Sequence, residues 1–276
     1  MDILEKLKRI KHVALDMDGT IYKGSRLFPF TVSFLEGLKQ LGITYSFLTN
    51  NPSRSTDEYV NHLRQMGISS MPEEIYTSAQ ATVEYIKINY PEVKKLFLLG
   101  TSGMTGEFEA DGFVSVDDTP NDSPDMVVVG FDRTLTYSRL CRACWWIGKG
   151  LPYIATNPDR ICPTNLPTVL VDCGSICACI EQAVGRKPDV VVGKPDPRML
   201  AGILKCYGLV PDEVAIVGDR LYTDIAMAKN TRSLGVLVLT GETQAEDLQK
   251  CNILPDMTVK DISVFGRLLA EAKQKN

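Results

Sequence analysis

VALDMDGT, residues 13–20, places two aspartates, Asp16 and Asp18, directly after a short apolar run. Such a run predicts a strand that is buried on both faces, as in a parallel sheet. Burying an unpaired charge costs a large free energy, so carboxylates at the end of a buried strand indicate a cationic partner. A simple tight turn is the alternative interpretation, because Asp and Gly also favour turns.

Polar residues follow three further apolar runs. Thr49 and Asn50 follow ITYSFL, Lys194 follows VVVG, and Asp219 follows VAIVG with Asp224 five residues later. Each of these groups alone also fits a loop or a turn. In an open parallel sheet, however, the carboxyl ends of the strands line one crevice, where ligands bind. Four such strand ends in order therefore predict a single phosphate-binding site.

Helical patterns separate these strands. In residues 31–42, Val32, Leu35 and Leu38 lie on one helical face and Gly42 ends the helix. Ser55 and Glu58 have the spacing of a capping box. Alternating strands and helices predict the α/β class, with a Rossmann-like doubly wound parallel sheet. The middle of the chain alternates similarly but contains an irregular acidic stretch at 110–124, which predicts a second α/β unit at 80–182 inserted between 1–79 and 183–276.

Composition excludes several classes of protein. The chain has 276 residues, 44% of them hydrophobic, and a net charge of −4 with acids and bases mixed along it. This balance argues against a partner that is a nucleic acid or a membrane surface. No apolar run approaches the roughly 20 residues of a membrane helix, and the N-terminal segment lacks the apolar stretch of a secretion signal. We therefore expect a cytoplasmic protein.

Eight cysteines raise the question of a metal or disulfide framework. Cys141 and Cys144 form a C-x-x-C pattern, and Cys177 and Cys179 lie two residues apart. Their flanks lack the Gly and Pro turns of a zinc knuckle and have a helical, apolar pattern. This predicts buried, reduced thiols, since free cysteine is a common core residue. A redox or metal role stays open.

The charge balance of the predicted site implies a metal ion. Three carboxylates, those of Asp16, Asp18 and Asp219, with the single amine of Lys194 would not attract a phosphate dianion. A divalent cation corrects this, and Mg²⁺ prefers hard oxygen ligands such as carboxylates. No histidine or thiolate lies in these motifs, which disfavours zinc.

The motifs DMDGT, LTNN, GKP and GDRLYTD resemble, in order, the four motifs of the haloacid dehalogenase (HAD) superfamily. The segments YTSAQAT, YIATNPD and CGSICACIE are similar to its NagD-like, p-nitrophenylphosphatase branch. Thr49 follows Asp16 by only 33 positions, whereas Lys194 follows Thr49 by 145, which fits a cap domain inserted after the second motif. The chain departs from the branch at VDCGS, residues 171–175, where many members have a PGTGS-like stretch.

The resemblance implies a phosphatase that works through an aspartyl phosphate. Asp16 is the expected nucleophile and Asp18 the expected general acid and base. Mg²⁺ is expected on a carboxylate oxygen of Asp16, the main-chain carbonyl of Asp18 and Asp219, with support from Asp224. An aspartate two residues after the nucleophile favours phosphoryl chemistry over dehalogenation.

The resemblance also assigns the phosphate and substrate contacts. Thr49, the main-chain N–H of Asn50, and Lys194 are expected to bind the phosphoryl oxygens. In the cap domain, Asn157 and Asp159 are candidate substrate contacts, although an Asn-Pro-Asp turn is the simpler interpretation. The segment KGSRLF after Thr20 is either a flap at the site entrance or a plain loop.

The expected substrates are small phosphomonoesters such as nucleoside monophosphates, sugar phosphates and p-nitrophenyl phosphate. Two alternatives remain at this point: a phosphotransferase with an acceptor other than water, and a catalytically silent phosphate-binding regulatory protein. Members of the branch often form dimers, so a homodimer is the assembly to test.

Overall fold

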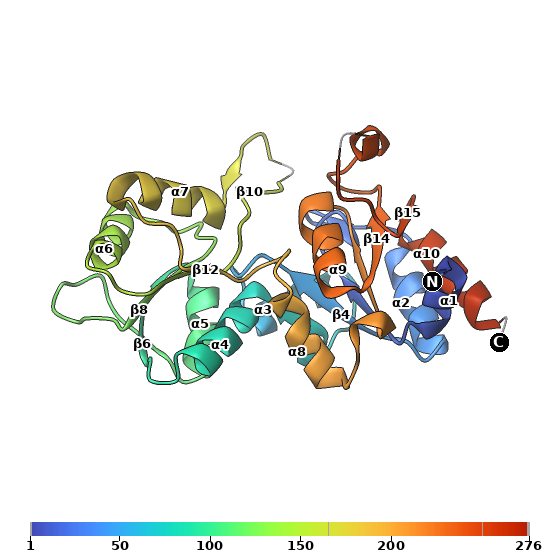
Figure 1. The fold of residues 1–276 in the computed structure, drawn as a ribbon, viewed down its shortest axis with the longest axis horizontal. Helices are drawn as coiled ribbons and strands as arrows, with labels where there is room; N and C mark the ends of the chain where they lie inside the picture. The colour runs from blue at the N-terminus through green and yellow to red at the C-terminus, as the bar shows by residue number, and fades with distance from the viewer. Residues whose placement is uncertain (1, 165, 250, 275–276) are drawn as a thin grey trace. The chain divides into compact units, whose positions relative to one another are not determined.

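The computed structural model describes residues 2–164, 166–249 and 251–274, and Figure 1 shows its helices and strands. The chain divides into two compact units. The core unit contains residues 1–49, 60–76 and 194–276, and the cap unit contains residues 50–59 and 77–193. The cap unit thus includes residues 50–59, 77–79 and 183–193, which lie outside the insertion expected at 80–182.

The core unit is built on one six-stranded sheet. The pairs β1–β13, β1–β4, β13–β14 and β14–β15 are parallel, as the apolar runs predicted. Every residue of the central strands β1 and β13 is buried, so both faces of the sheet are covered. The strand order across the sheet is β15 (Met257–Val259), β14 (Leu234–Val238), β13 (Val214–Gly218), β1 (His12–Leu15), β4 (Thr44–Thr49) and β5 (Ile75–Thr77).

Helices cover both faces of the core sheet. On one face α1 (Ile3–Arg9) and α2 (Thr31–Gln40) both contact α10 (Ile262–Gln274), while α9 (Ala226–Thr231) lies against β13 and β14 on the other face (Figure 1). In α2 the buried side chains are those of Thr31, Phe34, Leu35 and Leu38, whereas Val32 is exposed. The predicted helix is confirmed, but its buried face is rotated away from Val32.

Two further helices have well-defined ends, and the sequence predicted the start of the second. Helix α8 (Arg198–Tyr207) ends at Gly208, which has the left-handed backbone that Gly tolerates best. Helix α3 (Thr56–Gln65) begins with the capping box: Ser55 N–H donates to Glu58 Oε2 at 2.7 Å, and Glu58 N–H donates to Ser55 Oγ at 3.2 Å. Short turns complete the core unit: η1 (Pro72–Glu74), η2 (Pro211–Glu213), η3 (Leu221–Ile225) and η4 (Ala245–Gln249).

The cap unit has its own five-stranded parallel sheet. Its strand order is β12 (Val190–Val191), β9 (Tyr153–Ala155), β8 (Met126–Val129), β6 (Lys95–Leu99) and β7 (Val114–Ser115). The helices are α4 (Ser78–Asn89), α5 (Ser102–Ala110), α6 (Tyr137–Gly148) and α7 (Cys173–Val184), and β10 (Ile161–Cys162) and β11 (Leu170–Val171) form a separate two-stranded hairpin. The strand before Lys194 therefore pairs with β9 of the cap unit, and the prediction that it belongs to the core sheet was wrong.

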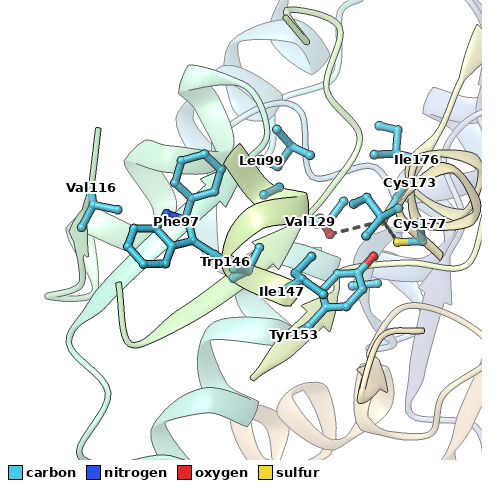
Figure 2. Close-up of a cluster of buried hydrophobic side chains, with 14 residues drawn as sticks. Phe97, Leu99, Val116, Val129, Trp146, Ile147, Tyr153, Cys173, Ile176 and Cys177 are labelled. Carbon is cyan, nitrogen blue, oxygen red and sulfur yellow. Dashed lines mark hydrogen bonds between the residues drawn. The ribbon is translucent and has the colours of Figure 1, made fainter. Parts of the chain in front are cut away.

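The cap core lies between its sheet and the packed helices α6 and α7, as Figure 2 shows. Cys173 and Cys177 are buried in this core, where the Cys173 thiol donates to the carbonyl of Val129 at 3.2 Å. None of the eight cysteines, all of which lie in the described part of the chain, forms a disulfide. Cys141 and Cys179 are exposed, however, because each lies off the apolar stripe of its helix. The prediction that they are buried was wrong.

Among the described residues, no helix has the length and apolar character needed to cross a lipid bilayer. The expected cytoplasmic location stays a prediction.

Candidate active site

Three carboxylates converge at the carboxyl ends of β1 and β13. Asp16 follows β1, and its N–H donates to the carbonyl of Val217 on β13 at 2.8 Å. Asp219 follows β13, and Asp224 lies in η3, a π-helical turn of the kind that is frequent at functional sites. One carboxylate oxygen from each of Asp16, Asp219 and Asp224 lies within 4.8 Å of the other two. The neighbouring parallel strands bring these residues together, as the sequence predicted.

Lys194 supplies a buried cation to this group. Its Nζ donates to Asp16 Oδ1 at 2.5 Å, to Asp224 Oδ1 at 2.7 Å and to the carbonyl of Leu48 at 3.2 Å. The residue is only 2% exposed. Lys194 therefore reaches the predicted site, although the strand before it belongs to the other sheet.

Burial and like charge shape the protonation of the group. Burial raises the pKa of Asp16 to about 6, an effect that Lys194 opposes. Burial also raises the pKa of Asp219 to about 8, and the carboxylates of Asp16 and Asp224 add to this rise. Burial by itself would lower the pKa of Lys194, but the two adjacent carboxylates outweigh it and raise that pKa. The site thus contains more negative charge than its one lysine offsets.

The two oxygens of Asp219 have different surroundings. Oδ2 accepts a hydrogen bond from the N–H of Glu242 at 2.6 Å. Oδ1 is buried and has no hydrogen-bond partner among the described residues. A buried carboxylate oxygen without a donor, beside two further carboxylates and no nitrogen or sulfur ligand, fits a hard divalent cation.

Asp18 stands beside the three-carboxylate group rather than in it. It forms an isolated bridge with Tyr22, at the start of a hairpin made of β2 (Tyr22–Lys23) and β3 (Arg26–Leu27). This hairpin is the segment expected to be either a flap or a plain loop. Burial raises the pKa of Asp18, while a hydrogen bond from the backbone of Gly24 opposes that rise.

Thr49 is the last residue of β4 and belongs to the core unit, whereas Asn50, the next residue, belongs to the cap unit. The carbonyl of Asn50 accepts hydrogen bonds from Ser78 Oγ at 2.8 Å and from Asn157 Nδ2 at 2.7 Å. Asn50 Nδ2 donates to Asp159 Oδ2 at 3.1 Å. The structure therefore gathers Asn157 and Asp159 around Asn50. None of these contacts tests the predicted phosphate and substrate roles, which stay predictions.

Comparison with known proteins identifies the family. One family model, described as haloacid dehalogenase-like hydrolase, matches residues 13–114, and a second, HAD-hydrolase-like, matches residues 191–264. The chain is 33% identical over 257 residues to an acid sugar phosphatase of Staphylococcus aureus, covering 93% of this chain and 97% of the relative. The chain belongs to the haloacid dehalogenase-like hydrolases.

Solved structures place this HAD hydrolase in the NagD-like branch. The 4-nitrophenylphosphatase of Thermotoga maritima is 42% identical with a TM-score of 0.89, over 95% of this chain and 98% of that one. A glycerol phosphate phosphatase of Mycobacterium tuberculosis, solved in complex with magnesium, is 29% identical with a TM-score of 0.85, over 96% of this chain and 77% of that one. Proteins named as NagD and p-nitrophenyl phosphatase are further neighbours. The protein is a phosphoric monoester hydrolase with an α/β cap domain.

Residues 171–175, where this HAD hydrolase departs from its branch, extend from the last residue of β11 into the first turn of α7. The carboxylate of Asp172 accepts from the N–H of Cys173 at 2.6 Å and caps the helix. A Cβ added to Gly174 would lie 2.3 Å from the carbonyl oxygen of Pro158, so this glycine allows the Asn157–Asp159 turn to pack closely on the start of α7. Asp172 therefore caps α7, and the absence of a side chain at Gly174 lets the backbone of residues 157–159 pack closely against this helix.

A fifth strand end lies at the site of this HAD hydrolase, although none of the four motifs contains it. Thr240, Gly241 and Glu242 follow the apolar strand β14, and the Glu242 N–H contacts Asp219 directly. Arg220, next to Asp219 in the chain, pairs with the Glu242 carboxylate at 2.9 Å. The rule that polar residues after a buried strand line the crevice also applies to this segment and would have found it.

Proposed function

We propose that the protein is a magnesium-dependent phosphatase of small phosphomonoesters, acting through a phosphorylated Asp16. This proposal rests on a cluster of three carboxylates, two of which accept hydrogen bonds from the buried Lys194, in a member of the HAD hydrolases. The reaction then requires a nucleophile, a proton donor, a phosphate-binding cation and a metal ion. The residues of the four motifs supply each of these parts.

Asp16, Asp219 and Asp224, with the main-chain carbonyl of Asp18, are the residues that would hold Mg²⁺. The unpartnered Oδ1 of Asp219 and the excess negative charge of the group support this assignment. When bound, Mg²⁺ offsets charge on the carboxylates and on the phosphoryl oxygens. The magnesium complex of the related glycerol phosphate phosphatase supports the choice of metal.

The first chemical step forms a bond between a carboxylate oxygen of Asp16 and phosphorus, while the ester P–O bond breaks. Asp16 needs no base, because a carboxylate is already an anion, and its hydrogen bond to Lys194 fixes its orientation. Asp18 donates its proton to the departing alcohol oxygen. The raised pKa of Asp18 supports this role, since a general acid must be protonated when the substrate binds.

The second step returns the enzyme to its starting state. The Asp18 carboxylate accepts a proton from water, whose oxygen attacks phosphorus. The acyl phosphate bond breaks, leaving Asp16 as a carboxylate and releasing inorganic phosphate. Lys194, Thr49 and the N–H of Asn50 are proposed to bind the phosphoryl oxygens, on which charge must be stabilised in both steps.

Phosphatase assays with p-nitrophenyl phosphate test the proposal directly. We expect turnover with Mg²⁺ that is lost in EDTA, and a loss of at least ~10³-fold in the Asp16→Asn variant. Asp212→Asn is the matched control, because Asp212 is exposed and lies in η2, before β13 begins. Normal turnover by Asp16→Asn would overturn the mechanism.

The same assay separates the two alternative functions. A phosphotransferase would release more p-nitrophenol than inorganic phosphate when glycerol or glucose is added as an acceptor. A silent phosphate-binding protein would release neither product, while still binding inorganic phosphate in calorimetry. Equal amounts of the two products, with and without acceptor, support hydrolysis.

The physiological substrate is proposed only as a class. The named relatives include an acid sugar phosphatase, a glycerol phosphate phosphatase and a 4-nitrophenylphosphatase. These relatives favour sugar and polyol phosphates as substrates over larger compounds. Nucleoside monophosphates are the class to compare with them. A panel of these compounds scored by kcat/KM with saturating Mg²⁺ ranks them. Asn157→Ala and Asp159→Ala in the same panel would test the predicted substrate contacts.

A further inference from the structure

We propose that the turn after β14 is a clasp that orients Asp219 for the metal ion, with Glu242 as its main positioning residue. The clasp consists of Thr240, Gly241 and Glu242, joined by Arg220 and Tyr222. The proposal rests on the magnesium site proposed above. Its three central residues, Thr240, Gly241 and Glu242, lie in none of the four motifs and need not touch the metal or the substrate.

The backbone of the clasp encloses one oxygen of Asp219. The N–H of Glu242 donates to Asp219 Oδ2 at 2.6 Å, and the N–H of Thr243 donates to the main-chain carbonyl of Asp219 at 3.2 Å. A Cβ added to Gly241 would lie 1.9 Å from Oδ2, and one added to Gly19 would lie 2.5 Å from it. Two glycine backbones therefore pack against the same oxygen, and neither position has room for a side chain.

Side chains fix the clasp in place. Glu242 accepts from Arg220 Nε at 2.9 Å and from the hydroxyl of Tyr222 at 3.0 Å. On the opposite side, Thr240 Oγ1 donates to the carbonyl of Gly19 at 2.5 Å. The turn is thus tied both to the segment that follows Asp219 and to the loop that follows Asp18.

These ties decide which oxygen of Asp219 is available. A hydrogen bond to a carboxylate is stronger than one between neutral groups, so the Glu242 N–H holds Oδ2 and sets the plane of the carboxylate. Oδ1, which is buried without a partner among the described residues, then remains for the cation. Groups that orient a metal ligand commonly change metal affinity about 10–100-fold when they are removed.

The effect on metal affinity can be measured without turnover. Mg²⁺ binding is followed by calorimetry, and Mn²⁺ binding by the electron paramagnetic resonance signal of the free ion. We expect Gly241→Ala to weaken both affinities about 10–100-fold, since its methyl group would displace Oδ2. Glu242→Ala keeps the N–H that binds Asp219 but removes the side-chain contacts with Arg220 and Tyr222, so we expect metal affinity to fall about 10-fold. Glu242→Gln keeps one acceptor oxygen, so its metal affinity should lie between those of Glu242→Ala and the wild type.

Matched controls exclude a general effect of the substitutions. Glu213→Ala breaks the ion pair of Glu213 with Lys11, which measures 2.6 Å and lies just before β13. Gly37→Ala adds a methyl group that meets no atom within 4 Å. Both controls should bind the metal ions as the wild type does. If Gly241→Ala fails to fold by circular dichroism, the Glu242 series decides the proposal.

The outcomes separate the clasp from the proposed function. If the clasp acts as proposed, the variants bind the metal ion more weakly than the wild type does. Their KM for p-nitrophenyl phosphate at saturating Mg²⁺ stays near the wild-type value. Wild-type metal affinity in Glu242→Ala and in the double variant Glu242→Ala, Tyr222→Phe would overturn it. A wild-type protein that binds Mg²⁺ without phosphatase turnover would refute the proposed function, and the affinities of the variants would still decide the clasp.

Discussion

His12 is expected to make the stability of the core unit depend on pH. The side chain lies on β1 and is fully buried. Its Nδ1 lies 2.8 Å from Thr44 Oγ1, its Nε2 has no hydrogen-bond partner among the described residues, and its ring packs against that of Tyr207 at 4.5 Å. Burial disfavours the charged imidazolium and lowers the pKa to about 4 from the usual 6.5.

The pKa shift sets the size of the effect. In the unfolded chain His12 binds a proton below about pH 6.5, whereas in the folded protein it stays neutral down to about pH 4. The unfolded state therefore binds more protons in this window, and the free energy of unfolding falls as the pH falls. The expected loss is about 2 kcal/mol between about pH 7.5 and pH 5, approaching about 3 kcal/mol below pH 4.

A comparison of the wild type with His12→Phe isolates this contribution. Phenylalanine keeps an aromatic ring against Tyr207 and cannot titrate. Urea unfolding followed by circular dichroism in EDTA, at about pH 7.5 and pH 5, should show about 2 kcal/mol more loss in the wild type. The raised pKa values of Asp16 and Asp219 act in the opposite direction, because those groups bind protons more tightly when folded, but they act in both proteins and cancel in the difference.

Nuclear magnetic resonance gives the pKa itself. The chain has only two histidines, His12 and His62, so a sample with labelled histidine shows two ring signals, which His62→Gln assigns. The His12 signal should not shift between about pH 7.5 and pH 5. A His12 signal that titrates near pH 6.5, or equal pH dependence of unfolding in both proteins, would refute the reasoning.

Three further predictions concern single side chains. Asp18→Asn should reduce turnover of alkyl phosphates more than that of p-nitrophenyl phosphate, because nitrophenolate leaves without a proton; equal losses in kcat/KM would contradict the acid role. Lys194→Met removes the cation between Asp16 and Asp224, and calorimetry should show phosphate affinity at least ~10-fold lower, from the loss of charge-assisted hydrogen bonds. Asp132→Asn breaks the 2.8 Å ion pair with Arg139 and should lower the free energy of unfolding of the cap unit by about 2 kcal/mol. A urea titration followed by tryptophan fluorescence measures this change, and an unchanged free energy of unfolding would show that the pair does not stabilise the cap unit.

Local sequence patterns were sufficient where a single element decides the outcome. The apolar run before Asp16 predicted a buried parallel strand, and the spacing of Ser55 and Glu58 predicted a helix start that the structure confirms. The convergence of Asp16 and Asp219, which follow the paired strands β1 and β13, was also predictable. Parallel strands place their carboxyl ends at one edge of a sheet, so residues that follow adjacent strands must meet there.

Sequence patterns failed where neighbouring elements compete for a segment. The apolar run before Lys194 has the composition of any buried parallel strand, and only its pairing with Tyr153–Ala155 assigns it to the cap unit. Cys141 and Cys179 lie within apolar helices, but the direction in which each helix faces its sheet decides which thiols are buried. Propensity fixes the type of an element, whereas packing fixes its neighbours and its buried face.

The sequence by itself determined the chemistry available to this protein: hard oxygen ligands, a lysine and the order in which they follow the strands. Only the tertiary structure decided how each group is held, such as the pairing of Lys194 with Asp224 and the contact of Glu242 with one oxygen of Asp219. The physical reason is one of scale. Strand and helix patterns arise from residues a few positions apart, whereas the Glu242–Asp219 contact joins residues 23 positions apart and depends on how two strands lie side by side.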